Sequence, residues 1–99
     1  SGMRHVRLIA YDIASPKRWR KVYRLMLGHG DGVQLSVFRC ELSDLELHRL
    51  KEEIWPILNL AEDRVMIVDL GPVEGRGDEC MEFWGAPRME PSVRSATIL

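Results

Sequence analysis

Two runs of apolar, β-prone residues constrain the fold of this chain more than any other feature. The first, HVRLIAYDI, spans residues 5–13, and the second, RVMIVDL, spans residues 64–70. Neither run alternates strictly between apolar and polar residues, which is typical of strands that are apolar on both faces. Turn-forming residues close both runs, ASP after the first and GP after the second. The sequence therefore predicts two strands, one near each end of a single folded unit.

An amphipathic helix is predicted over residues 16–27. Ser15 suits the N-cap, Pro16 suits the first helical position, and Gly28 suits the residue that ends the helix. At about 100° per residue, the two faces of this helix differ in character. One face is apolar and carries Trp19, Val22, Tyr23 and Met26, and the opposite face, called the basic ridge below, carries Lys17, Arg20, Lys21 and Arg24. The helix is expected to pack by the apolar face and to expose the basic ridge.

The middle of the chain holds a further strand region and a second helix. Residues 33–42, VQLSVFRCEL, form either one long kinked strand or a short hairpin that turns near Ser36. Ser43 and Glu46 form a capping box, which predicts the start of the second helix. Pro56 is expected to kink or end that helix.

This order of elements predicts an α+β sandwich of the ferredoxin-like type, βαββαβ, with two helices on one face of a single sheet. We assign residues 3–72 to this domain and residues 73–99 to a C-terminal tail that adds a strand and contacts a dimer or other partner. Candidate strands in the tail are ECMEFWG (79–85) and SVRSATIL (92–99). Residues 1–2 are interpreted as a cloning remnant. A chain of 99 residues buries only about 60–65% of its unfolded surface, so a homodimer is expected.

Charge is divided unevenly along the chain. Residues 1–40 carry eight Lys and Arg residues against two acids, and residues 41–99 carry six against thirteen, although the net charge is only -1. Either the basic half faces a polyanion such as nucleic acid, or the two halves neutralise each other across the fold. No run approaches the roughly 18 apolar residues of a membrane helix, and the two cysteines lack CxxC spacing. We therefore expect a cytoplasmic protein with reduced thiols and no membrane association.

Four landmarks, taken in order, resemble a known family. They are YDI (residues 11–13), the basic helix, GVQLSVF (32–38) and DRVMIVDLGP (63–72). In this combination, over roughly residues 4–72, the chain resembles the second of the two near-universal CRISPR-associated proteins, the small subunit of the spacer-acquisition complex. The resemblance implies a prokaryotic ferredoxin-like homodimer whose C-terminal strand crosses onto the partner's sheet. Many members are described as metal-dependent nucleases of RNA or duplex DNA, and others act as a non-catalytic bridge between two dimers of the CRISPR integrase.

The resemblance gives Asp12 the central role. One carboxylate is a poor site for Mg²⁺, which takes about six oxygen ligands, but a two-fold dimer brings in a second Asp12. Two Asp12 side chains, water and a phosphate oxygen would then hold one Mg²⁺, which would activate water for phosphodiester hydrolysis. From the residues alone, the simpler alternative is that Asp12 caps the strand–helix turn.

The resemblance also implies a set of residues that bind the nucleic-acid backbone. Arg18 and Arg20 match an R-x-R at the start of the family's first helix, and Lys21 and Arg24 continue the basic surface. Ser36, in the family's S-V-F, is a candidate phosphate ligand near the dimer axis. Because the helix shows no base-reading motif, we expect binding to backbone and shape and not to sequence.

Contacts with protein partners are assigned to three aromatic residues. Phe38 is expected in the dimer interface, and Phe83 and Trp84 are expected to anchor the tail on the dimer or on the integrase. Gly32 departs from the family pattern, which places a basic residue there, and this departure favours the bridge over the nuclease. A generic ferredoxin-like regulatory dimer is a third interpretation, against which the QLSVF motif argues.

Overall fold

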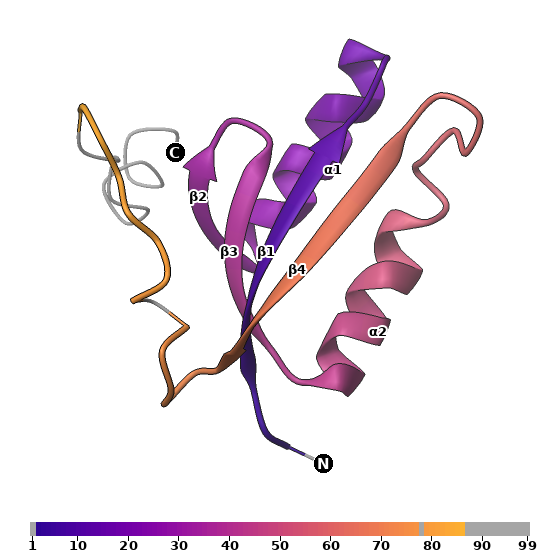
Figure 1. Cartoon of the computed structure of the whole chain (residues 1–99). Coiled ribbons are helices and arrows are strands. Elements are labelled where there is room, and N and C mark those ends of the chain that lie inside the picture. Colours follow the sequence, from indigo (N-terminus) through magenta and orange to yellow (C-terminus); the bar gives the residue numbers. More distant parts are fainter. Residues whose placement is uncertain (1, 78, 87–99) are drawn as a thin grey trace.

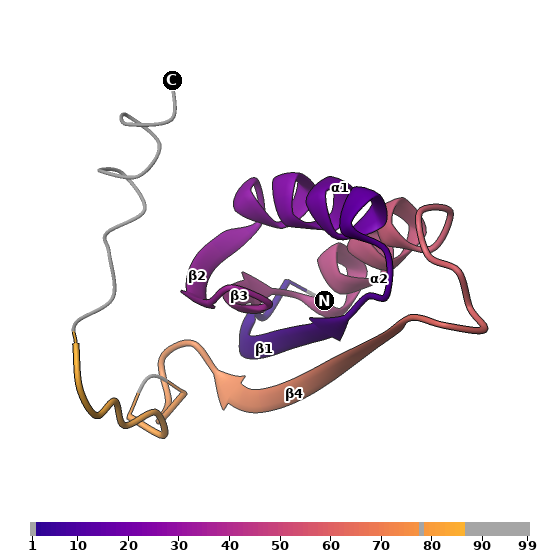
Figure 2. The ribbon, with the colours of Figure 1, turned by 90° about the horizontal axis from the view of Figure 1, so that it is seen from above.

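The computed structural model describes residues 2–77 and 79–86 of the chain. Within them the elements are β1 (His5–Asp12), α1 (Pro16–Leu27), β2 (Gly30–Gln34), β3 (Val37–Leu42), α2 (Asp44–Ile54) and β4 (Arg64–Pro72). The strands form one antiparallel sheet in the order β2-β3-β1-β4. Figure 2 shows both helices on the same face of this sheet, which confirms the predicted ferredoxin-like architecture. Neither helix has the length and apolar content needed to cross a membrane.

Helix α1 begins and ends at the predicted residues. The Ser15 hydroxyl accepts a hydrogen bond from the Arg18 amide at 3.3 Å, Pro16 occupies the first turn, and Gly28 caps the C-terminus. Val22 and Met26 are buried against the sheet. All four residues of the basic ridge are exposed on the opposite face. Helix α2 begins with the predicted capping box and ends at Ile54, just before Pro56.

Residues 33–42 fold as a hairpin, which decides between the two alternatives left open by the sequence. Strands β2 and β3 are joined by a turn at Leu35 and Ser36. The Tyr11 hydroxyl donates to the Leu35 carbonyl at 3.3 Å, and the Trp19 indole N–H donates to the Ser36 hydroxyl at 2.8 Å. The turn is therefore fixed to β1 and to α1.

Phe38 lies in the core and not in an interface. Its side chain is 0% exposed in the single chain, at the centre of the layer between the sheet and the helices. Its ring stacks on Tyr11, with centroids 6.3 Å apart, and meets Tyr23 edge-on at 5.7 Å. Burial also raises the pKa of the Tyr11 hydroxyl. Phe38 is thus unavailable to a dimer partner, because alternation along β3 directs it toward α1.

The other face of the sheet, called the open face below, carries no helix (Figure 2). Side chains alternate along β1 and β4, so half of each strand's apolar residues point to this face. It carries Leu8, Ala10, Val37, Met66 and Val68. Met66 is 59% exposed, since β4 is an edge strand. Both strands are apolar on both faces, as expected, but β1 is buried mainly on its helix side and most of β4 is exposed.

The tail covers one corner of the open face. A Cβ at Gly77 would lie 2.6 Å from Cγ2 of Val6, so the chain passes so closely that only glycine fits there. Residues 79–85 do not form the short strand that their sequence allows. The other candidate strand, residues 92–99, lies outside the described residues.

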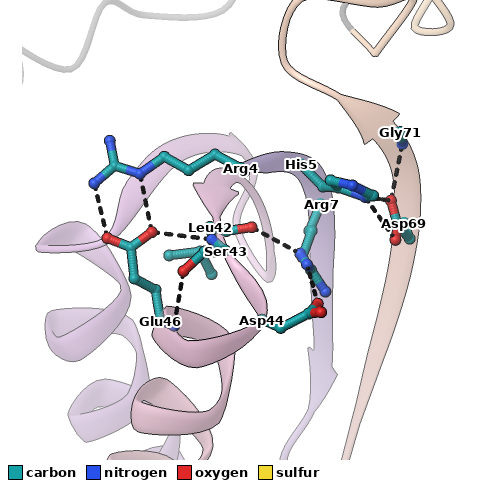
Figure 3. A network of polar contacts seen from close by, with 9 residues as sticks. All are labelled: Arg4, His5, Arg7, Leu42, Ser43, Asp44, Glu46, Asp69 and Gly71. Atoms are coloured by element: carbon teal, nitrogen blue, oxygen red, sulfur yellow. Dashed lines mark hydrogen bonds and ion pairs between the residues drawn. The ribbon is translucent and has the colours of Figure 1, made fainter. Parts of the chain in front are cut away.

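A polar network fixes the start of β1 to the start of α2 (Figure 3). Asp12 lies at the other end of β1. Arg4 donates to both oxygens of Glu46, at 2.9 and 2.7 Å. The buried Arg7 side chain donates to the Leu42 carbonyl at 3.1 Å and to Asp44 at 2.8 Å. Because these groups are paired with one another, the network serves the fold and not ligand binding.

This network predicts a loss of stability in acid. Hydrogen bonds from Arg4, and then from the Ser43 amide, lower the pKa of Glu46 from 4.5 to about 2. Ionised Glu46 therefore stabilises the folded chain above about pH 4.5, and this contribution is lost as pH falls toward 2. In urea unfolding at a series of pH values, Glu46→Gln should be less stable than the parent at neutral pH. The difference in the free energy of unfolding between the two proteins should shrink as the pH falls from about 4.5 toward 2.

The matched control is Glu52→Gln, which changes an exposed acid on the same helix. Its stability should follow the parent within experimental error at every pH. A Glu46→Gln curve that stays parallel to the parent curve through the acid window would contradict the assignment.

Candidate functional site

Asp12 is the last residue of β1 and lies exposed at the edge of the open face. It pairs in register with Arg64, the first residue of β4. Both side chains line a hollow of about 580 Å³ that also includes Ser36. The Asp12 carboxylate accepts no hydrogen bond from the described residues. It does not cap the strand–helix turn, and it is free to meet a ligand.

The cap of that turn is Asp63, which the sequence analysis did not single out. Its carboxylate accepts a hydrogen bond from the Ala14 amide at 2.9 Å and another from the Asn59 amide at 2.9 Å. Arg18 adds two more, at 2.7 and 3.1 Å. The Asp63 side chain is 0% exposed. Its pKa is held well below the ordinary range, first by the Arg18 guanidinium and then by the two amides.

We call this group the Asp63 hub: the Asp63 carboxylate, Arg18, and the amides of Ala14 and Asn59. It joins the loop after β1, the start of α1 and the loop before β4 in one buried contact. The only signal for it in the sequence is an acid directly before an apolar strand, which does not distinguish Asp63 from the neighbouring Glu62. A carboxylate buried with four donors is instead recognised from the folded chain.

The structure separates the two arginines that the sequence grouped together. Arg18 also contacts Glu62 at 3.1 Å, and Asp63 chiefly raises the pKa of its guanidinium. Its donors are therefore largely used inside the protein. Arg20, Lys21 and Arg24 remain exposed and form no side-chain hydrogen bond or ion pair with any described residue.

The remaining candidates lie in two separate places. The Ser36 hydroxyl accepts from Trp19 and keeps its own proton for donation into the hollow beside Asp12. Phe83 and Trp84 lie in the tail, which leaves the sheet on the side away from α2 (Figures 1 and 2). Trp84 is 88% exposed. The structure does not bring these two aromatic residues to Asp12.

No group of three or more His, Cys, Asp or Glu residues in the described part of the chain is arranged to hold a metal ion. A single protomer thus offers Asp12 as one unpartnered carboxylate beside a cation. Such an arrangement can bind a phosphate group through the cation, or share a metal with ligands from elsewhere.

Comparison with known families decides where this arrangement belongs. The family model described as CRISPR associated protein Cas2 matches residues 3–74. The chain belongs to the Cas2 family. This match covers all six elements, the Asp12 hollow and the Asp63 hub.

Similar proteins of known sequence carry the same family name. One from Geobacter sulfurreducens, named CRISPR-associated endoribonuclease Cas2, is 43% identical over 97 residues, covering 98% of this chain and all of that protein. A second, from Rhodospirillum rubrum and named CRISPR-associated endoribonuclease Cas2 1, is 42% identical over 74 residues, covering 75% of this chain and 72% of its own length.

Two solved structures have the same fold. The crystal structure of Streptococcus pyogenes Cas2 superposes with a TM-score of 0.71 at 28% identity, covering 81% of this chain and 99% of that one. A hypothetical protein from Thermus thermophilus, TT1823, gives 0.72 at 31% identity, covering 87% and 96%.

Proposed function

We propose that this protein acts in CRISPR adaptation, where new spacers are acquired, as a homodimer that binds the phosphate backbone of nucleic acid. In this proposal it also hydrolyses phosphodiester bonds with a divalent metal at Asp12. The observation that carries the proposal is the unpartnered Asp12 carboxylate, which lies beside Arg64 at the rim of an uncovered sheet face. The endoribonuclease names of its relatives support the same reaction class.

The open face supports the homodimer. Met66 and Val68 are exposed on it, and Leu8, Ala10 and Val37 are half-buried between them. An apolar surface that stays exposed in a single chain favours association. A two-fold partner across this face would bring a second copy of the same residues, and therefore a second Asp12, to the interface.

Mg²⁺ fits this shared site and not a single protomer. Asp12 is exposed and unpaired, so its oxygens are available, but one carboxylate leaves most of the coordination shell to other ligands. An Asp12 from each protomer, with water and phosphate oxygens, would hold the ion. Bound there, Mg²⁺ would polarise the phosphoryl group and lower the pKa of a water ligand. The protein's own part is to hold the carboxylates and the backbone in place.

The alternative within the family is a structural bridge that spans two integrase dimers without cleaving nucleic acid. The single acid per chain and the loss of a basic residue at Gly32 favour it. The exposed Phe83 and Trp84, preceded by Glu79 and Glu82, supply an apolar and acidic segment for an integrase subunit. Backbone binding is common to both roles.

Backbone binding by the basic ridge is tested by salt dependence. The double substitution Arg20→Gln/Arg24→Gln should weaken binding to a labelled DNA duplex regardless of its sequence. The slope of log affinity against log salt should become shallower by about 0.9 for each phosphate that is no longer neutralised. Arg49→Gln is the control and should leave the slope unchanged, because it removes an exposed charge of α2 that has no partner among the described residues. Equal slopes for the parent and the double variant would reject the ridge.

A further inference from the structure

No pattern in the sequence identified Arg64 as a site residue. The sheet places this cation directly opposite Asp12. In register pairing, the Cβ atoms of opposite residues lie about 4.5–5.5 Å apart on the same face. Alternation along the chain directs Asp63 inward and Arg64 outward, onto the open face with Asp12. Two adjoining hollows, one at the sheet end and one toward Ala61, are lined by both Asp12 and Arg64.

Arg64 is available for a ligand, whereas Arg18 is not. The Arg64 side chain is exposed and forms no hydrogen bond or ion pair with the described residues. Arg18 is only 25% exposed in its side chain and donates to Asp63 and Glu62. A guanidinium that is already bound to two carboxylates has few donors left for a phosphate.

The Asp63 hub fixes both residues of the pair. It holds the Asn59 amide before β4 and the Ala14 amide after β1, so the backbone on either side of the Arg64–Asp12 pair is anchored to one buried carboxylate. Arg64 directly follows Asp63 in the chain. The backbone at Arg64 is therefore held in place before a ligand arrives, so binding has to order only the Arg64 side chain.

We propose that Arg64 is the arginine that binds the phosphate group at the Asp12 hollow, and that Arg18 is a positioning residue that holds the hub. This inference rests on the proposed backbone binding and names the contact at its centre. A guanidinium presents paired donors that match two phosphate oxygens. Asp12 does not bind the phosphate itself, so the carboxylate and the guanidinium serve different ligands at one place.

The test compares Arg64→Gln, Arg18→Gln and Arg49→Gln, each of which removes one positive charge. Affinity for a labelled DNA duplex and for a labelled single-stranded RNA is measured over a range of salt, at a temperature where every variant is shown by circular dichroism to be folded. Arg64→Gln should make the slope shallower by about 0.9 on duplex DNA and about 0.7 on the single strand. Arg18→Gln and Arg49→Gln should keep the parent slope, and Arg18→Gln should lower the melting temperature.

A shallower slope in Arg64→Gln could arise from a lost phosphate contact or from the loss of the charge that neutralises Asp12. Repeating Arg64→Gln in an Asp12→Asn background separates these two causes. A slope change that persists in this background supports the contact, and one that disappears overturns it. A parent-like slope for Arg64→Gln, or a shallower slope in folded Arg18→Gln, also overturns the inference. The Arg64 contact and backbone binding can fail separately. If Arg64→Gln keeps the parent slope but Arg20→Gln/Arg24→Gln makes the slope shallower, the proposed backbone binding stands and only the Arg64 contact is rejected.

Discussion

Replacement of Asp12 by asparagine is expected to reduce metal-dependent cleavage of RNA or DNA to the background of an enzyme-free sample. Asparagine keeps the size of the side chain but removes the charge that attracts a divalent metal. Because Asp12 accepts no hydrogen bond from the described residues and is exposed, the substitution should leave the melting temperature unchanged. Added Mg²⁺ should not restore cleavage, since the missing ligand and not a low ion concentration limits the reaction.

The same variant distinguishes the nuclease from the bridge. Nucleic-acid affinity should stay the same or rise, because one negative charge near the backbone is removed. Spacer integration with the integrase should persist, since the basic ridge and the apolar residues of the open face are unchanged. Glu74→Gln, an exposed acid beyond the far end of β4, is the control and should match the parent in every assay. Loss of integration in folded, nucleic-acid-binding Asp12→Asn would mean that the Asp12 carboxylate itself is required for integration.

Replacement of Asp63 by alanine is expected to lower the melting temperature by about 10 °C or more, a large shift for a domain of this size. The change removes the acceptor of four hydrogen bonds and leaves Arg18 and two amides without their buried partner. Hydrogen exchange should show loss of protection at the Ala14 and Asn59 amides in particular. Thermal unfolding followed by circular dichroism measures the first effect, and amide exchange measures the second.

Glu62→Ala provides the matched control for the hub. Glu62 contacts the same Arg18 but its side chain is 57% exposed. Exposed ion pairs contribute little to stability, so the melting temperature should fall by at most about 4 °C. An Asp63→Ala protein that melts with the parent, or a Glu62→Ala protein that melts far below it, would contradict the role assigned to Asp63.

Local patterns in the sequence predicted most of the fold. Ser15, Pro16 and Gly28 bound α1, and the capping box of Ser43 and Glu46 starts α2. These signals act within one turn of chain, so the sequence alone contains them. The choice between a kinked strand and a hairpin at Ser36 could not be made in this way. It depends on contacts from Tyr11 and Trp19, which are distant in the sequence.

The candidate site was predicted less completely than the fold, because its charged residues pair with partners that are distant in the sequence. Asp12 and the exposed basic ridge were identified from the sequence. The pairing of Arg18 with Asp63, 45 residues away, was not. The pairing of Arg64 with Asp12 likewise follows from the register of β1 with β4, which no local pattern specifies. Phe38 was misplaced for the same reason, since its face depends on the position of the turn.

The outer edge of β4 has a consequence for handling the protein. Its central residues, VMIV at positions 65–68, combine β propensity with apolar character, and Met66, Ile67 and Val68 are exposed. No described residue pairs with that edge. Segments of this kind template aggregation, and charged flanking residues act as gatekeepers against it. Arg64 and Asp69 bracket the segment, so Arg64 also limits self-assembly. A lower purified yield of Arg64→Gln would therefore indicate aggregation through the edge of β4. The nucleic-acid affinity of this variant should be compared with that of the parent only at concentrations where sedimentation shows no aggregate.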